Sequence, residues 1–164
     1  MTQELDSRMK LAMASESTSA ARNRLYAAKA KKEGRLALAK LMTAMATGEQ
    51  ISARRALIHL RGKIGQAAAH LGELRRQKKA AADQIYPASR QAAGAAGDRS
   101  AEAAFGQFEK VCRNHAALLD APGIDTVDHD LFVCQVCGFI ALDAIPENCP
   151  VCGAVPERFK AAVV

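Results

Sequence analysis

No apolar run in this sequence of 164 residues is long enough to cross a membrane, because a spanning helix needs about 20 consecutive apolar residues. The N-terminal segment MTQELDSRMK is polar and mixed in charge, and it lacks the apolar stretch of a secretory signal. We therefore expect a soluble cytoplasmic protein with no membrane partner. Thiols stay reduced in that compartment, so the five cysteines are expected to hold metal more readily than to form disulfides.

Acidic residues are outnumbered by basic ones outside the last part of the chain, with 12 Asp and Glu against 21 Lys and Arg in residues 1–127. The formal net charge is +6, of which residues 128–164 carry −3, so residues 1–127 carry +9. Opposite charges of this size favour docking of the two parts on one another, within one chain or between chains. A single basic cluster, such as that at 75–79, is equally well explained as a solvated helix face.

The first 121 residues show the periodicity of helices. Apolar or small residues recur at helical spacing over 4–33, 35–61, 66–95 and 100–120, and Pro87 predicts a kink or break near Tyr86. Four helices with short connections predict a bundle over 1–121, followed by a linker at 122–127. Residues 128–164 contain three of the seven aromatic residues and many Pro and Gly. They predict a loop-rich module too small to be stabilised by apolar burial alone.

Two C-x-x-C-G motifs stand in this module, with eleven residues between them. Their cysteines are Cys134, Cys137, Cys149 and Cys152. The glycines that follow, Gly138 and Gly153, allow a positive φ, so that backbone N–H groups can point at sulfur. Two such turns facing each other form a tetrahedral sulfur site that suits zinc or a single iron. The spacing alone does not decide between these metals, because zinc ribbons share it.

The residues around the cysteines resemble the C-terminal domain of rubrerythrin. The resemblance lies in LFVCQVCGF at 131–139, in IPENCPVCGA at 145–154 and in ERF at 157–159, and it covers almost the whole module. It implies a rubredoxin-type centre in which the four cysteines bind one iron that carries one electron. Four thiolates would give a charge of about −1 with ferric and about −2 with ferrous iron, so hydrogen bonds to sulfur and burial would set the potential.

Three polar residues of the predicted bundle fall on otherwise apolar helix faces: Glu16, Glu49 and His115. A carboxylate in such a place is costly unless it is paired, hydrogen-bonded or bound to metal. Any one of the three is well explained by an ordinary core or surface role. Their occurrence on three different helices favours a metal site.

The resemblance to rubrerythrin extends through the bundle, at 16–34 and at 85–87, and implies a ferritin-like domain that holds two irons. The family's site needs a Glu on the first helix, Glu-x-x-His on the second, Glu-x-x-Glu on the third and Glu-x-x-His on the fourth. Glu16, Glu49 and His115 match these positions. The remaining positions are occupied by Ser52, Ala81, Gln84 and Cys112.

Missing carboxylates bear directly on the chemistry, because bridging carboxylates neutralise two irons and hold them close together. We therefore expect the diiron centre, and the peroxidase activity that the family implies, to be lost. A residual site could bind a single zinc or ferrous iron through Glu16, Glu49, Cys112 and His115. Alternatively the bundle is metal-free, and its carboxylates are hydrogen-bonded to neighbouring side chains.

The sequence thus predicts an electron-transfer protein that takes electrons from a reductase or ferredoxin-like donor and delivers them to a partner protein. Rubrerythrins commonly form dimers in which the small domain reaches the neighbouring bundle, so we expect a homodimer, with domain swapping as one form of it. One alternative is an active peroxide reductase of oxidative-stress defence with an altered metal site. Another is a zinc-ribbon protein, structural or binding nucleic acid. The acidic ribbon and the lack of an aromatic or arginine-rich strand argue against nucleic acid.

Overall fold

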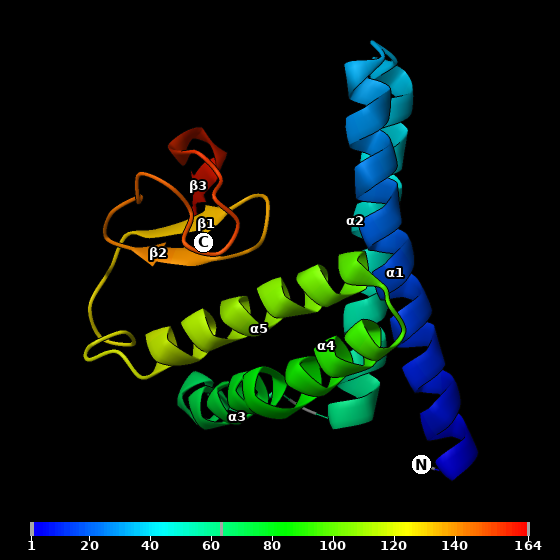
Figure 1. The fold of residues 1–164 in the computed structure, drawn as a ribbon. Coiled ribbons are helices and arrows are strands. Elements are labelled where there is room, and N and C mark those ends of the chain that lie inside the picture. Colours follow the sequence, from blue (N-terminus) through cyan, green and yellow to red (C-terminus); the bar gives the residue numbers. More distant parts are fainter. Residues whose placement is uncertain (1, 63, 164) are drawn as a thin grey trace. The chain divides into compact units, whose positions relative to one another are not determined.

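The computed structural model describes residues 2–62 and 64–163, and the chain divides into two compact units, at 1–65 and 66–164 (Figure 1). The first unit contains two long helices. The second contains three further helices and a small sheet. Within the residues that the structure describes, no helix is both long and apolar enough to span a membrane.

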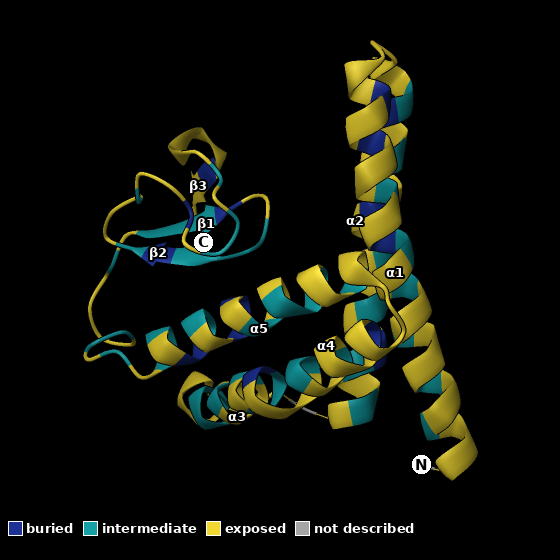
Figure 2. Ribbon diagram, in the orientation of Figure 1, coloured by how far each residue is buried: buried dark blue, intermediate teal, exposed yellow. Residues whose placement is uncertain are grey.

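The first unit is an antiparallel hairpin of α1 (Gln3–Lys32) and α2 (Leu36–Arg61). Thr2 caps α1 by accepting a hydrogen bond from the Leu5 N–H, and Gly34 makes the connecting turn with a φ of +73°. The buried positions form a narrow stripe between the helices (Figure 2). They are all alanines: Ala20, Ala27, Ala30, Ala39, Ala46 and Ala56. Small side chains let two helices approach closely, but each buries little apolar area.

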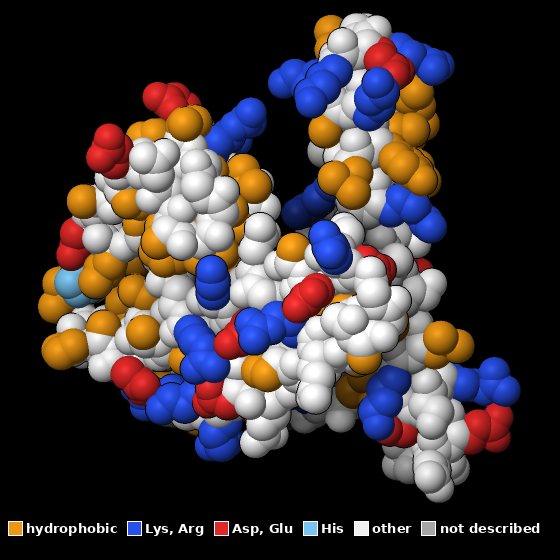
Figure 3. All heavy atoms as spheres, viewed as in Figure 1, with side chains coloured by type: hydrophobic (Ala, Val, Ile, Leu, Met, Phe, Trp, Pro, Cys, Tyr) orange, Lys and Arg blue, Asp and Glu red, His pale blue; other side chains and the backbone are white. Residues whose placement is uncertain are grey.

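The hairpin also carries most of the positive charge of the chain. Residues 1–65 contain 13 Lys and Arg and 5 Asp and Glu, a formal charge of +8. Basic side chains gather around the closed end of the hairpin (Figure 3), where Lys29, Lys31, Lys32 and Arg35 lie. Large apolar side chains stay exposed on the same unit, among them Leu11 and Leu25 with exposed fractions of 71% and 72%.

In the second unit the predicted third helix is built from three segments. They are α3 (Ala67–Ala80), the π-helical turn η1 (Ala81–Ile85) and α4 (Tyr86–Ala95). Pro87 has no N–H to donate, which weakens the regular helical pattern at this place. The Tyr86 N–H bonds the Ala81 carbonyl, five residues back, instead of the usual four. The break expected near Tyr86 is therefore a π turn that keeps the chain helical.

Helix α5 (Arg99–Leu119) packs against α3 and α4. Asp98 caps its start by accepting a hydrogen bond of 2.9 Å from the Ala101 N–H. At its end, the Arg75 guanidinium donates to the Leu119 carbonyl and pairs with Asp120 at 2.6 Å, which complements the negative end of the helix dipole. Three rings, Tyr86, Phe105 and Phe108, pack together between α4 and α5, with centroids 5.6–6.4 Å apart.

The C-terminal module is a three-stranded antiparallel sheet in the order β2-β1-β3. The strands are β1 (Leu131–Cys134), β2 (Ile140–Leu142) and β3 (Phe159–Ala161), and a short 3-10 helix, η2 (Pro156–Arg158), precedes β3. Two cysteines form much of its core, together with Ala141 and Phe159. The Phe139 ring meets Phe159 edge to face, with centroids 6.5 Å apart. Such a core is small for independent stability.

The predicted fold class, long helices followed by a small strand-and-loop module, is confirmed. The helix ends differ from the predicted ones by a few residues, as expected for frayed ends. The predicted linker at 122–127 consists of turns and bends between α5 and β1. Its role as a domain boundary stays a prediction.

Candidate metal centre

Each cysteine pair lies on a tight turn with the same hydrogen-bond pattern. In the first turn, the Gly138 N–H donates to the Cys134 carbonyl at 2.9 Å, and the Cys134 N–H donates to the Phe139 carbonyl at 2.9 Å. The second turn repeats both bonds at 2.8 Å. The Gly153 N–H donates to the Cys149 carbonyl, and the Cys149 N–H donates to the Ala154 carbonyl. The turns are therefore two copies of one local structure.

Glycine is required in these turns because of the backbone angle. Gly138 has a φ of +85° and Gly153 a φ of +72°, values that residues with a Cβ rarely adopt. This conformation aims the following N–H groups at sulfur. The Phe139 N–H hydrogen-bonds the Cys137 sulfur, and the Ala154 N–H hydrogen-bonds the Cys152 sulfur.

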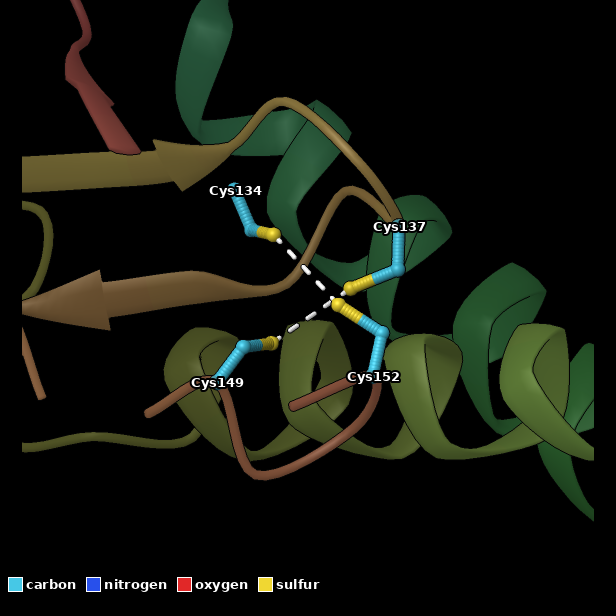
Figure 4. A group of neighbouring side chains, drawn as sticks. All are labelled: Cys134, Cys137, Cys149 and Cys152. Atoms are coloured by element: carbon cyan, nitrogen blue, oxygen red, sulfur yellow. Dashed lines mark hydrogen bonds between the residues drawn. The ribbon is translucent and has the colours of Figure 1, made fainter. Parts of the chain in front are cut away.

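The four sulfur atoms point toward one another from the two turns (Figure 4). All four Sγ atoms lie within 4.8 Å of one another, with 3.7 Å between Cys134 and Cys152 and 3.6 Å between Cys137 and Cys149. A tetrahedral centre with metal–sulfur bonds of about 2.3 Å places its sulfurs about 3.8 Å apart. A disulfide needs about 2.05 Å, so the spacing fits a shared metal ion. The donor set and its geometry therefore suit iron or zinc.

The thiols differ in acidity when no cation is shared among them. For Cys134, burial acts to raise the pKa, but the N–H groups of Cys137 and Val136, together with hydrogen bonds to the Cys152 and Cys137 thiols, outweigh it and lower the pKa to about 7. Burial raises the pKa of Cys137 and of Cys152, although one N–H group at each sulfur opposes the rise. Since thiolates are the ligands, metal binding must displace these protons, and N–H groups at sulfur make that easier.

Two residues of α5 hold the first turn and strand β2. The Asn114 side-chain amide donates to the Ile140 carbonyl at 3.1 Å and accepts from the Ile140 N–H at 2.9 Å. The His115 Nε2 lies 2.9 Å from the Gly138 carbonyl oxygen. Sequence reasoning missed Asn114, because its only signal is its place beside His115 on a helix. It also gave no sign that His115 contacts the module.

The residues of the proposed residual bundle site are divided between the two units. Glu16 and Glu49 are half-buried on the hairpin, whereas Cys112 is buried and His115 half-buried on α5. Both oxygens of Glu49 accept hydrogen bonds from the Asn23 side-chain amide, at 2.8 and 2.9 Å. In residues 2–62 and 64–163, the only group of three or more ligating side chains brought together is the four-cysteine cluster. The residual site stays a prediction.

Comparison with known proteins agrees with this geometry. The family model for the rubrerythrin rubredoxin-like domain matches residues 132–160. Rubrerythrin-2 of Clostridium acetobutylicum is 32% identical over 84 residues, which span 48% of this chain and 46% of that relative's length. The structures of nigerythrin in the mixed-valence state and in the fully reduced, all-ferrous state are both similar with a TM-score of 0.55 at 22% identity. Each alignment covers 96% of this chain and 86% of nigerythrin, and it shows a shared fold.

The fold and the sulfur cluster define a helical protein with a C-terminal rubredoxin-like four-cysteine domain. Residues 132–160 match the rubredoxin-like domain of rubrerythrin, as the sequence predicts, 84 residues are similar to Rubrerythrin-2, and the chain shares its fold with nigerythrin. The alignment reaches less than half of the length of Rubrerythrin-2, so the activity of that protein is not carried over to this chain.

Proposed function

We propose that this protein is an electron carrier whose four-cysteine centre binds one iron. The observation that carries the proposal is the sulfur cluster, with four Sγ atoms within 4.8 Å of one another and N–H groups directed at the sulfurs. Bound there, a single iron would supply a ferric–ferrous couple. The N–H groups at Cys134, Cys137 and Cys152 favour the extra negative charge of the reduced centre.

Burial supports a role in exchange with a partner protein. Cys134 and Cys149 are buried, with exposed fractions of 1% and 3%, whereas Cys137 and Cys152 are half-buried. Val136, between the first two cysteines, is 61% exposed. The side of Cys137 and Cys152 is therefore the natural approach for a redox partner. The module's formal charge of −3 favours a partner with a basic docking face.

We also propose that the protein forms a homodimer through the hairpin. A groove of 770 Å³ runs along α1 and α2, and apolar side chains such as Met13, Leu25 and Leu57 line it together with Arg24 and Arg54. An exposed apolar surface of this kind marks an interaction site. The hairpin carries +8 and the C-terminal module −3, so the module of a second copy is a complementary occupant. Sedimentation velocity at low and high salt tests this, and a salt-independent monomer would contradict it.

A visible spectrum with metal analysis tests the electron-carrier proposal. We expect protein from iron-supplemented cells to be red, to hold one iron per chain and to be bleached by dithionite and recoloured by air. Cys137→Ser should lose the colour. Cys112→Ser is the matched control, because Cys112 lies outside the cluster, and it should keep the colour.

Other metal contents would contradict the electron-carrier proposal. A colourless protein that holds one zinc, even after iron supplementation, would rule out electron transfer and leave a structural module. Two or three irons per chain with turnover of hydrogen peroxide would favour the peroxide reductase. In that case Glu49→Gln should reduce turnover without changing the rubredoxin-type spectrum.

A further inference from the structure

The peptide group between Gly138 and Phe139 is hydrogen-bonded on both sides. Its carbonyl oxygen lies 2.9 Å from the His115 Nε2, and its N–H is directed at the Cys137 sulfur. A carbonyl oxygen can only accept, so His115 must donate through an Nε2–H. A continuous chain of hydrogen bonds therefore runs from the α5 imidazole through one peptide to one sulfur.

The environment of His115 fixes this donor. Burial lowers the pKa of His115, the Gly138 hydrogen bond opposes this, and the charge of Lys78 adds to the lowering. The hydrogen bond to the Gly138 carbonyl requires a proton on Nε2 whatever the charge of the ring. Asn114, the preceding residue, makes a separate contact with the module, because it is bonded to both backbone groups of Ile140.

The second cysteine turn provides a reference within the same molecule. The peptide between Gly153 and Ala154 also directs its N–H at a sulfur, that of Cys152. Within residues 2–62 and 64–163, however, no group donates to the Gly153 carbonyl oxygen. The two turns thus share their local geometry, but only the first has a histidine that donates to its glycine carbonyl.

A donor at a peptide carbonyl polarises the peptide and strengthens the hydrogen bond made by its N–H, by roughly 10–30% per bond. An N–H···S bond stabilises the more negative, reduced form of a thiolate-bound iron. We propose that His115 is a positioning residue that raises the reduction potential of the four-cysteine centre through the Gly138–Phe139 peptide. This inference rests on the proposed electron-carrier function. It assigns to the helix a role in the redox centre that needs no metal in the bundle.

Three variants separate this effect from simple docking of the module. His115→Phe keeps a ring of similar size but removes the donor. His115→Gln keeps an N–H at a similar distance from the backbone. Asn114→Ala removes both hydrogen bonds to Ile140 and leaves the His115 donor in place.

The reduction potential of the iron-loaded, full-length protein is the first readout. For His115→Phe we expect the ratio of reduced to oxidised centre at a fixed potential to fall about threefold, which is about 28 mV at 59 mV per tenfold for one electron. His115→Gln should restore most of this loss, and Asn114→Ala should match the wild type. An unchanged potential in His115→Phe would overturn the inference. So would an equal shift in Asn114→Ala, because docking would then be the cause.

A second readout uses the wild-type protein loaded with zinc. It therefore depends neither on iron binding nor on whether a substituted protein folds. Stronger hydrogen bonds lower the deuterium–protium fractionation factor of an amide. We expect a lower factor for the Phe139 amide than for the Ala154 amide, measured by NMR. Equal factors, or the reverse order, would overturn the role of His115. If the protein fails to cycle with iron while Phe139 shows the lower factor, the electron-carrier function fails and the polarised peptide stands.

Discussion

Replacement of the two turn glycines by alanine tests whether backbone conformation alone limits the metal centre. Gly138 and Gly153 have φ values of +85° and +72°. A Cβ added at Gly153 would meet no atom within 4 Å, and one at Gly138 would meet only the Val111 Cγ1, at 3.9 Å. Neither contact is a clash. The cost of each substitution is therefore the left-handed backbone itself, about 1–2 kcal/mol.

A cost of about 1–2 kcal/mol in the bound state weakens metal binding by about 5- to 30-fold. We expect Gly138→Ala and Gly153→Ala to lose zinc affinity to this extent, with Gly138→Ala at the upper end because its φ is larger. Competition with a chromophoric chelator measures the affinity under reducing conditions.

Gly48→Ala is the matched control. Gly48 lies in the interior of α2, and a Cβ there would also meet nothing within 4 Å. The substitution should leave zinc affinity unchanged and stabilise the helix by about 0.8–1.0 kcal/mol, measured by urea unfolding. An unchanged affinity in both turn variants would refute the backbone argument. Loss of all binding in either one would show that side-chain packing, and not φ, limits the turn.

Three other outcomes follow from the contacts. Asn23→Leu removes the donor of both Glu49 hydrogen bonds and should destabilise the hairpin by about 1 kcal/mol in urea unfolding; an unchanged midpoint would show that water replaces the amide at no cost. Removal of the metal with a chelator under reducing conditions should unfold the C-terminal module and leave the far-ultraviolet helical signal, because the metal supplies folding free energy to the module alone. A parallel loss of helical signal would show that the helices are not stable without the module. Zinc affinity should fall as pH decreases from about 8 to about 6, because protons compete for the thiolates and burial raises the pKa of Cys137 and Cys152; a flat profile would contradict thiolate ligation.

The four-cysteine cluster could be predicted from the sequence because its determinants are local. Each turn places two sulfurs within four residues, and the glycine that follows the second cysteine indicates a positive φ. Helix positions were predictable for a similar reason, since helical periodicity extends over many residues. The π turn at 81–85 was not predictable beyond a break near Pro87, because a π turn and a kink leave the same sequence signal.

The roles of polar residues on apolar faces could be predicted only in part. The sequence indicates that Glu49 needs a partner on its apolar helix face. The partner itself, Asn23, could not be predicted, because it lies 26 residues away on the other helix and no spacing rule links the two. His115 was identified as a candidate metal ligand from its place on the helix. In the structure its Nε2 is bonded to Gly138, so a metal in the bundle would have to bind Nδ1 or displace this bond.

Contacts of α5 with the module also bear on why the helices would remain if the diiron ligands are incomplete, as the sequence predicts. The module has a small core and gains three hydrogen bonds from Asn114 and His115 on one turn of a helix. A helix can hold those two side chains in place only if it is itself held, and α5 is fixed by α3, α4 and the ring cluster around Phe105. The helices of the second unit therefore have a structural task at the four-cysteine centre. That task would preserve them under selection for the proposed electron transfer, whether or not the bundle binds metal.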